Sequence, residues 1–339
     1  MKLTKDLKVL LLIYLILVLV PIFVHTDLYL MNILIIGLIW SVVAASWDLI
    51  MGFSGIFTFG QIAFFVIGAY SSAILTQTFG LSPWLGMPFG GLVAGLTGLL
   101  VGLPCLRLKG AYVALVTFAV HMILAPFLKS DLGRALGTGG SQGILTIKPL
   151  HFFGYSFSSM EPLPWFYTAL FISLICLLAV HRIIHSNWGL AFTAIRDAEP
   201  FANSLGIDGF KYKLAVFGIT SFLTGVIGGF YAHYVGMLST RILGLNLFLI
   251  LMVMLVMGGL GRFPGAVIGA YLATFLSEWL RPLGNYRMLI FGGLVVLLVV
   301  YMPQGIAEIL FPQDKPGPLQ RIRRLFHPKD RRASLPNDS

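Results

Sequence analysis

A segment rich in glycine and hydroxyl residues separates two long apolar runs near the start of the chain. It occupies residues 51–65 and reads MGFSGIFTFGQIAFF. If the flanking runs cross a bilayer, non-helical backbone here is tolerated only where it is buried in protein or lines a wet cavity. Broken helices of this kind present free N–H and C=O groups to substrates, and the N-terminus of a half-helix favours carboxylates. The segment predicts either a substrate site or a tightly packed turn that binds no ligand.

A charged insert at residues 182–213 interrupts the apolar runs later in the chain. Its pattern predicts two short helices, at 189–196 and 199–205. Asp197 is suited to cap the second of these helices, and Gly206 is suited to end it. The insert is either a plain connection or the surface on which a separate motor acts, since a chain that moves a solute without its own ATPase needs such a surface.

The sequence lacks the usual catalytic motifs. No Gly-Lys pair occurs, so there is no P-loop, and no H-E-x-x-H zinc motif occurs. His121 and His233 lie inside apolar runs, where an ionisable residue is a candidate functional group. A neutral histidine hydrogen-bonded between helices is the simpler interpretation of each. An intramembrane enzyme built on either histidine would also need a nucleophile or a carboxylate partner that the sequence does not place beside it.

Carboxylates give little support to ion-coupled transport. No paired carboxylates occur within the apolar runs, and Asp48 and Glu278 are expected near span ends, within reach of water or lipid headgroups. Cys105 and Cys176 both lie in apolar runs and are interpreted as small core residues. We therefore expect no metal, no disulfide and no cofactor in this chain.

The elements that carry these residues must be membrane helices. The chain has 339 residues, of which 58% are hydrophobic and only 11% are charged, against roughly 25% charged residues in soluble domains. Between Asp48 and Arg107 lie 58 consecutive uncharged residues, far more than the roughly 20 that span a bilayer once. The sequence therefore predicts an all-α polytopic membrane protein.

Charges and Gly/Pro clusters divide the chain into about ten expected spans. These are 7–24, 28–47, 60–79, 84–106, 110–128, 163–181, 214–240, 242–261, 263–280 and 288–303. With both termini in the cytosol, 17 Lys and Arg residues fall on the cytosolic side and six fall outside, as the positive-inside rule requires. The loop 129–162 then faces outward, and the insert 182–213 faces the cytosol.

The placement of the basic residues indicates a role in setting the membrane orientation rather than in nucleic-acid binding. The net charge is +10, and seven of the 23 Lys and Arg residues follow residue 310. We expect a membrane domain over residues 1–310 and a disordered basic cytosolic tail over 311–339, with its arginines near anionic lipid.

Two runs of small residues predict close helix contacts. In the first run, successive glycines are four, three and four positions apart, which places them on one face of a helix, and the second run has a similar spacing. Their members are Gly91, Gly95, Gly98 and Gly102, and Gly265, Gly269 and Ala273. Packing within the chain is the simpler interpretation, and a contact between subunits is the alternative.

Six motifs in sequence order resemble the permeases of branched-chain amino-acid ABC importers, of the LivM type. They are GFSGIFTFGQIAFFVIGAY at 52–70, LRLKGAYVALVTFA at 106–119, TGGSQGI at 138–144, AIRDAEPFANSLGI at 194–207, GGLG at 258–261 and MPQGI at 302–306. Pro200-Phe201 and Gln61 depart from the usual residues of this family, which leaves the choice of ATPase partner and of substrate open. Related permeases for urea, short amides and simple sugars share much of the layout.

The resemblance implies a transport subunit of the bacterial cytoplasmic (inner) membrane and not an enzyme. Its implied partners are a second homologous permease, two cytosolic ATPases that hold ATP and Mg²⁺, and a periplasmic or lipoprotein substrate-binding protein. An ion-coupled secondary transporter remains the alternative. The implied substrate pathway comprises Phe57, Thr58, Gly60, Gln61 and Phe64; the coupling site comprises Arg196, Asp197, Glu199, Ala202 and Gly206; the loop facing the binding protein comprises Thr138, Gly139, Gly140 and Gly143.

Overall fold

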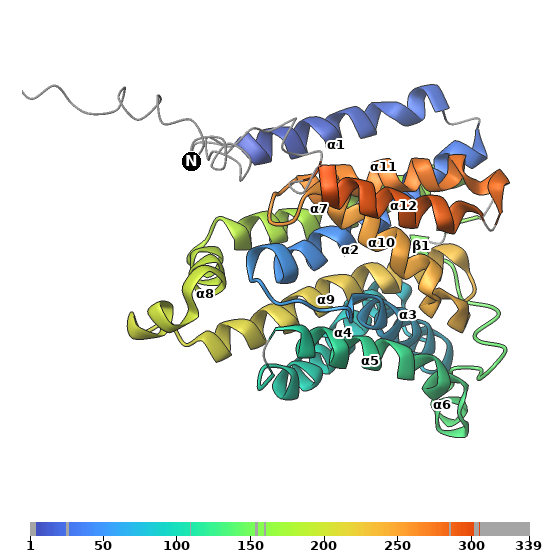
Figure 1. Cartoon of the computed structure of the whole chain (residues 1–339). Helices are drawn as coiled ribbons and strands as arrows, with labels where there is room; N and C mark the ends of the chain where they lie inside the picture. The colour runs from blue at the N-terminus through green and yellow to red at the C-terminus, as the bar shows by residue number, and fades with distance from the viewer. Residues whose placement is uncertain are drawn as a thin grey trace, which may run out of the picture.

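A computed structural model describes residues 5–24, 27–108, 110–152, 155–158, 161–284, 286–301 and residue 305. The predicted tail at 311–339 lies outside the described residues, as does the motif at 302–306 apart from Gly305. The described chain is almost entirely helical (Figure 1).

A helix coincides with each of the ten expected spans. These helices are α1 (Lys5–Val24), α2 (Leu28–Asp48), α3 (Gln61–Thr78), α4 (Pro83–Cys105), α5 (Ala111–Lys129), α7 (Pro162–Ile184), α9 (Gly209–Val235), α10 (Leu245–Gly258), α11 (Gly265–Trp279) and α12 (Tyr286–Tyr301). Among the described residues, five stretches are long and apolar enough to cross a membrane by themselves, namely Leu28–Phe53, α4, α5, α7 and α9. The chain is thus a multi-pass helical membrane protein.

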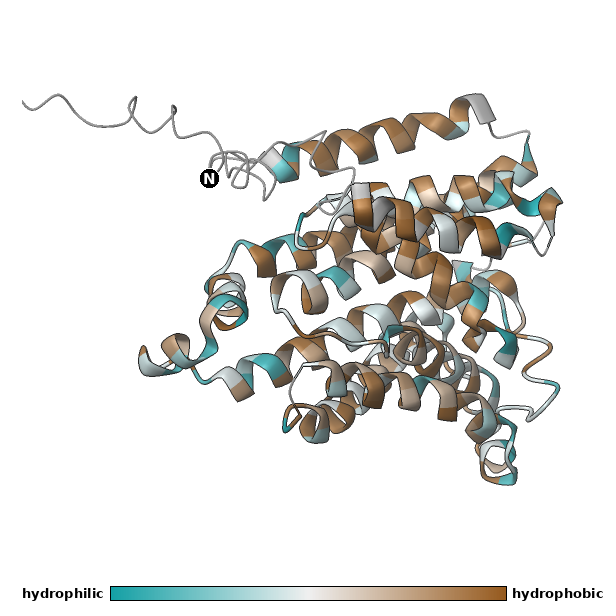
Figure 2. Ribbon diagram, viewed as in Figure 1, coloured by the Kyte–Doolittle hydropathy of each residue, from teal (hydrophilic) through white to brown (hydrophobic). Residues whose placement is uncertain are grey.

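The polar segments gather at the two ends of this helical bundle. The insert forms α8 (Asn187–Ser204) at one end, and the expected outward loop forms α6 (Asp131–Ala135) at the other (Figure 1). Apolar residues dominate the bundle between them, as Figure 2 shows. The outward loop also holds a two-stranded antiparallel hairpin, β1 (His151–Phe152) and β2 (Tyr155–Ser156), which the all-α prediction lacked. Two short 3₁₀ helices, η2 (Thr240–Leu243) and η3 (Arg281–Leu283), lie in connections.

The glycine face of α4 packs within the chain, against α9. A Cβ at Gly91 would overlap Val226, and a Cβ at Gly98 would overlap Ser221. The second run behaves alike, because a Cβ at Gly269 would overlap the backbone of α10 at Met254. Small residues let these backbones approach closely, so the intramolecular interpretation is confirmed for both runs.

His233 joins three parts of the fold. Its Nε2 lies 3.0 Å from Ser72 Oγ on α3, and its Nδ1 lies 2.8 Å from the carbonyl oxygen of Lys148 in the outward loop. The side chains of His233 and Ser72 are both buried. The expected role as a histidine hydrogen-bonded between elements is therefore confirmed for His233. Cys105 and Cys176 are buried, as expected of small core residues.

Candidate functional site

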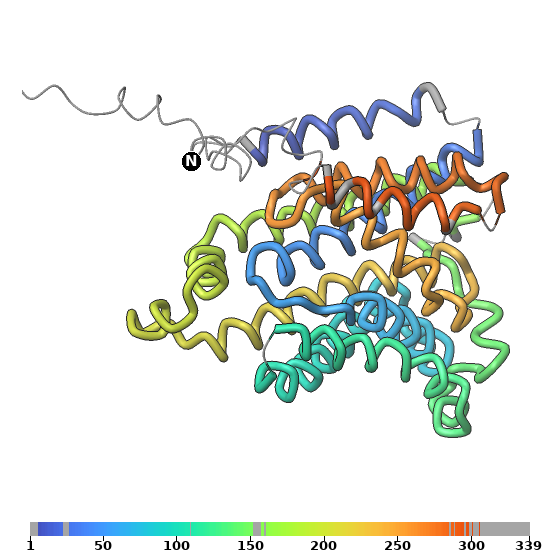
Figure 3. The backbone as a smooth tube through the Cα atoms, in the orientation of Figure 1, coloured from blue at the N-terminus to red at the C-terminus, as the bar shows by residue number. Residues whose placement is uncertain are grey.

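The chain leaves helical form between α2 and α3, as the glycine-rich segment predicts. A π-helical turn, η1 (Leu49–Phe53), extends α2, and residues 54–60 then follow a non-helical path to Gln61 (Figure 3). Gly55 has a φ of +69°, a conformation that glycine adopts at no steric cost. Two side chains hold this path: Trp47 Nε1 donates to the carbonyl oxygen of Thr58 at 2.7 Å, and Thr117 Oγ1 accepts from the Phe59 N–H at 2.9 Å.

The residues implied for the substrate pathway occupy this segment and the first turn of α3. Phe57 is half exposed, whereas Thr58, Gln61 and Phe64 are buried and Gly60 is the N-terminal cap of α3. Neither the amide nitrogen nor the amide oxygen of Gln61 has a hydrogen-bond partner among the described residues. A buried, unpaired amide is costly, so Gln61 has two hydrogen-bonding atoms that the described residues leave unused.

An aromatic cluster covers the same segment from α5 and α10. Phe59 lies edge-on to Phe248 at 5.3 Å and to Phe118 at 6.3 Å between ring centroids, and His121 stacks on Phe118 at 6.1 Å. Both ring nitrogens of His121 are buried, and the ring also meets the backbone of Leu243 in η2. His121 thus differs from His233 in that aromatic rings dominate its surroundings, and its ring is part of the cluster.

The insert folds as two short helices that meet at a kink in α8. Ala198 has extended dihedral angles (φ −156°, ψ 77°), so the break is where the sequence predicts it. The predicted cap was wrong by one residue: Ala198 occupies the cap position, and the Asp197 carboxylate instead accepts from Arg196 Nε at 2.9 Å. At the other end, Gly206 has the expected left-handed conformation (φ +86°). The Gly206 and Ile207 N–H groups donate to the carbonyl oxygens of Asn203 and Ala202, which is a Schellman C-cap.

Arg196 connects α8 directly to the broken segment. Its Nη1 donates to the carbonyl oxygen of Gly52 at 2.7 Å across 144 positions of sequence. Its aliphatic stem lies against Gly55, where a Cβ would approach Arg196 Cγ to 2.5 Å. The first implied coupling residue is therefore in contact with the segment that carries the implied pathway.

Asp48 belongs to the same junction and not to a solvated span end. Its side chain is 1% exposed, and its Oδ1 accepts from the Gly261 N–H at 2.6 Å. A Cβ at Gly52 would overlap both Asp48 and Gly261. The expectation that water or headgroups reach Asp48 was wrong, because the loop between α10 and α11 folds over the carboxylate. Glu278 is partly exposed, and its Oε2 accepts from Tyr29 and from Arg281.

The second short helix of α8 has one side that contacts the rest of the chain and one exposed side. Glu199 Oε1 accepts from Lys213 Nζ at 2.6 Å, and Ala202 is buried. Phe201 and Leu205, four positions apart on one helix face, are each about two-thirds exposed. Sequence reasoning noted Phe201 only as a departure from the family and omitted Leu205; an i, i+4 apolar pair in a charged insert was the available signal.

The turn that follows leads directly into α9. Asp208 caps that helix by accepting from the Lys211 N–H. This hydrogen bond, together with the Lys211 side chain, lowers the pKa of the exposed Asp208 carboxyl. The two helices of the insert and α9 are thus joined by a tightly bonded connection.

The loop implied to face the binding protein is built on left-handed glycines. Gly139, Gly140 and Gly143 have φ values of +73°, +61° and +74°. Thr138 Oγ1 donates to the carbonyl oxygen of Leu128 at 2.7 Å and fixes the loop to α5. A bridge between Ile144 and Leu238 joins it to the segment after α9.

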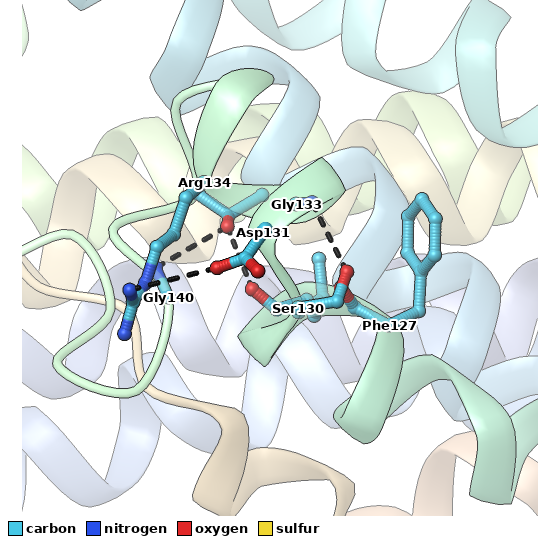
Figure 4. Close-up of polar contacts among 8 residues, drawn as sticks. Phe127, Ser130, Asp131, Gly133, Arg134 and Gly140 are labelled. Carbon is cyan, nitrogen blue, oxygen red and sulfur yellow. Dashed lines mark hydrogen bonds and ion pairs between the residues drawn. The ribbon is translucent and has the colours of Figure 1, made fainter.

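Helix α6 stands beside this loop. Ser130 caps it by accepting from the Gly133 N–H, and Arg134 pairs with Asp131 at 3.7 Å (Figure 4). Gly140 lies against the Arg134 side chain. The loop therefore presents a defined, charged surface at the end of the bundle opposite α8.

The described residues contain no group of three His, Cys, Asp or Glu side chains that could hold a metal ion. The geometry offers a non-helical segment within a helical bundle, lined by aromatic rings and contacted by a peripheral helix. Such an arrangement suits the passage of a solute controlled from one face.

Comparison with known proteins gives consistent matches. Residues 29–299 match the family model described as branched-chain amino acid transport system / permease component. The chain is 30% identical over 299 residues to the high-affinity branched-chain amino acid transport system permease protein LivM of Escherichia coli (strain K12) and to that of Salmonella typhimurium. Each alignment covers 82% of this chain and 70% of the relative.

A more distant relative is the nucleoside ABC transporter permease protein NupC of Lactococcus lactis, which is 25% identical over 193 residues, covering 53% of this chain and 59% of the relative. No solved structure matches the chain. The family model spans most of the helical bundle, including the broken segment, the outward loop and α8. The chain belongs to the family of permease components of branched-chain amino acid transport systems.

Proposed function

We propose that the chain is the membrane-spanning permease subunit of an ABC importer that translocates branched-chain or related amino acids. Its implied partners are a second homologous permease, two cytosolic ATPases that hold ATP and Mg²⁺, and a periplasmic or lipoprotein binding protein, all at the bacterial cytoplasmic membrane. The observation that carries the mechanism is the hydrogen bond from Arg196 to the carbonyl oxygen of Gly52.

This contact makes α8 a transmitting element. When the ATPases close, α8 moves with them, and Arg196 carries the movement to η1 and to the non-helical residues 54–60. A charge-assisted hydrogen bond of this type contributes about 1.5–3 kcal/mol, enough to favour one arrangement of the broken segment over another by at least about tenfold. ATP hydrolysis and access to the pathway are coupled in this way.

The substrate class rests on the family and on the lining of the broken segment. Both 30%-identical relatives are named for branched-chain amino acids. The rings of Phe57, Phe59 and Phe248 give an apolar path, and the amide of Gln61 offers both a donor and an acceptor. An aliphatic side chain and a charged head group match these two kinds of surface.

Uptake measurements distinguish the solutes. In a strain that lacks only this gene, we expect loss of labelled leucine uptake and its return on complementation. Uptake of labelled urea and ribose should not change. Normal leucine uptake together with loss of urea or ribose uptake would contradict the amino-acid assignment and support the related permeases for those solutes. Leucine uptake that survives ATP depletion while ion gradients persist would instead support an ion-coupled carrier.

The exposed pair on α8 is the proposed ATPase contact. Phe201 and Leu205 stand free of the membrane domain, and apolar aromatic anchors commonly dominate the energetics of interfaces. Phe201→Asp is expected to prevent co-purification of the ATPases, whereas Phe201→Leu keeps the apolar surface and should retain them. Full ATPase recovery with Phe201→Asp would place the contact elsewhere.

A further inference from the structure

A cavity of about 360 Å³ lies where α8 meets the broken segment. Its walls come from residues 54–57, from the turn between α4 and α5, from α8 and from the first turns of α9. It opens on the face that the charge distribution assigns to the cytosol. The cavity therefore touches both the implied pathway, at Phe57, and the element implied to couple it to ATP.

Three charged side chains line one part of this cavity. They are Arg196, Glu199 and Lys213, two cations and one carboxylate. Glu199 and Lys213 form an ion pair at 2.6 Å, with exposed fractions of 44% and 22%. A pair as open to water as this contributes little stability, so a ligand can separate it at little cost.

Most of the other lining side chains are apolar, and Ser54 adds a hydroxyl. Phe57, Leu108 and Val113 contribute from three separate segments. Charge of both signs on one part and an apolar wall on another match a molecule with an ammonium group, a carboxylate and an aliphatic side chain. The volume is sufficient for one such molecule.

We propose that this cavity is a cytosol-facing binding site for an aliphatic α-amino acid, and that its occupancy slows further import. The inference rests on the proposed function for the identity of the solute. The carboxylate of the ligand forms ion pairs with Lys213 and Arg196, and its ammonium group forms an ion pair with Glu199. The internal ion pair is exchanged for two intermolecular pairs, so no charge is left unpaired in the cavity.

Occupancy acts on coupling through geometry. A ligand held by Arg196 and Glu199 on α8 and by Lys213 on α9 fills the space beside residues 54–57. It thereby restrains the contact between Arg196 and Gly52 through which α8 acts on the broken segment. Accumulated product thus limits its own import.

The first test is transport by the complete transporter in liposomes, with the binding protein outside and ATP inside. Unlabelled L-leucine inside is expected to lower the initial rate of labelled leucine import at least about fivefold, the lower end of typical couplings between sites. Leucinamide, which lacks the carboxylate, and inorganic phosphate, which lacks the ammonium group, should not lower it. Equal inhibition by phosphate would show a plain anion site and overturn the proposal.

Two variants and one control locate the effect, each normalised to its own rate in empty liposomes. Lys213→Met removes a ligand-binding charge, and Leu108→Trp fills the cavity without changing its charge; both should abolish inhibition by internal leucine. Lys211→Met removes the same charge two positions away, where Lys211 is 81% exposed and pairs with Asp208, and should retain inhibition. Inhibition that persists in both cavity variants would overturn the proposal.

Direct binding separates this proposal from the proposed function. Equilibrium dialysis of labelled leucine against the solubilised transporter without binding protein is expected to show binding that Lys213→Met abolishes. Absence of leucine import into empty liposomes would refute the proposed function. Normal import without leucine binding or internal inhibition would refute only the cavity site.

Discussion

Replacing Gln61 with leucine tests whether the broken segment binds a solute. The amide is 1% exposed, and both of its polar atoms lack a partner among the described residues. Burying such a group unpaired costs about 1–3 kcal/mol, and leucine has a similar volume without the polar atoms. Gln61→Leu is therefore expected to stabilise the protein by up to about this amount while it lowers leucine uptake.

The measurement pairs thermal unfolding of the purified transporter with leucine uptake in liposomes. A gain of this size appears as a rise of a few degrees in the unfolding temperature. Gln77→Leu is the matched control, because Gln77 lies on the same helix but its amide donates to the carbonyl oxygen of Thr146; it should not stabilise. If Gln61→Leu lowers the unfolding temperature and leaves uptake unchanged, the amide has a structural role and the assignment to the pathway is wrong.

Further predictions concern coupling and packing. Arg196→Met removes the hydrogen bond to Gly52 and should lower ATP-driven uptake at least about tenfold while ATPase activity continues. An unchanged ratio of solute transported to ATP hydrolysed would contradict the proposal that Arg196 transmits the movement of α8. Proline in place of Gly206 cannot adopt a φ of +86°, so Gly206→Pro should abolish uptake while the permease remains in the membrane. Immunoblotting of membrane fractions measures the amount of permease. Normal uptake would show that this C-cap has no role in coupling. Gly228→Ala places a Cβ against the backbone of Phe65 and should lower the free energy of unfolding by about 1–3 kcal/mol. Gly293→Ala is the control, because nothing lies near the added Cβ, and it should not destabilise the protein. Equal thermal stability of the two variants would contradict the packing argument.

The helices were predictable because their signals are local. Long apolar runs between charges gave the ten helical segments, and the glycines at 52, 55 and 60 gave the break. The kink in α8 lies where the sequence predicts it, because Pro200 and Gly206 frame the second short helix, and only the cap residue was wrong by one position. These features depend on neighbours within one or two helical turns, so one sequence contains them.

The junction was not predictable because its partners are distant in sequence. Arg196 and Gly52 are 144 positions apart, and Asp48 and Gly261 are 213 apart. The position of Asp48 beside a glycine-rich segment suggests a solvated end, and only the folded loop after α10 shows that the carboxylate is buried. His121 and His233 looked alike in sequence, and their different surroundings include residues of distant elements, Phe248 on α10 beside His121 and Ser72 on α3 beside His233.

The glycine contacts among α3, α4 and α9 have a mechanical consequence. Gly68 meets Gly225 backbone to backbone, Gly90 meets Gly68, and Gly228 meets Phe65. Backbone atoms, which cannot change rotamer, form the tightest of these contacts, so we expect the three helices to move together. Because α8 is joined to α9 by a short, bonded turn, we expect a force on α8 to act on this whole block. In the proposed mechanism, opening and closing then occur at the edge of the block, with residues 54–60 as the hinge.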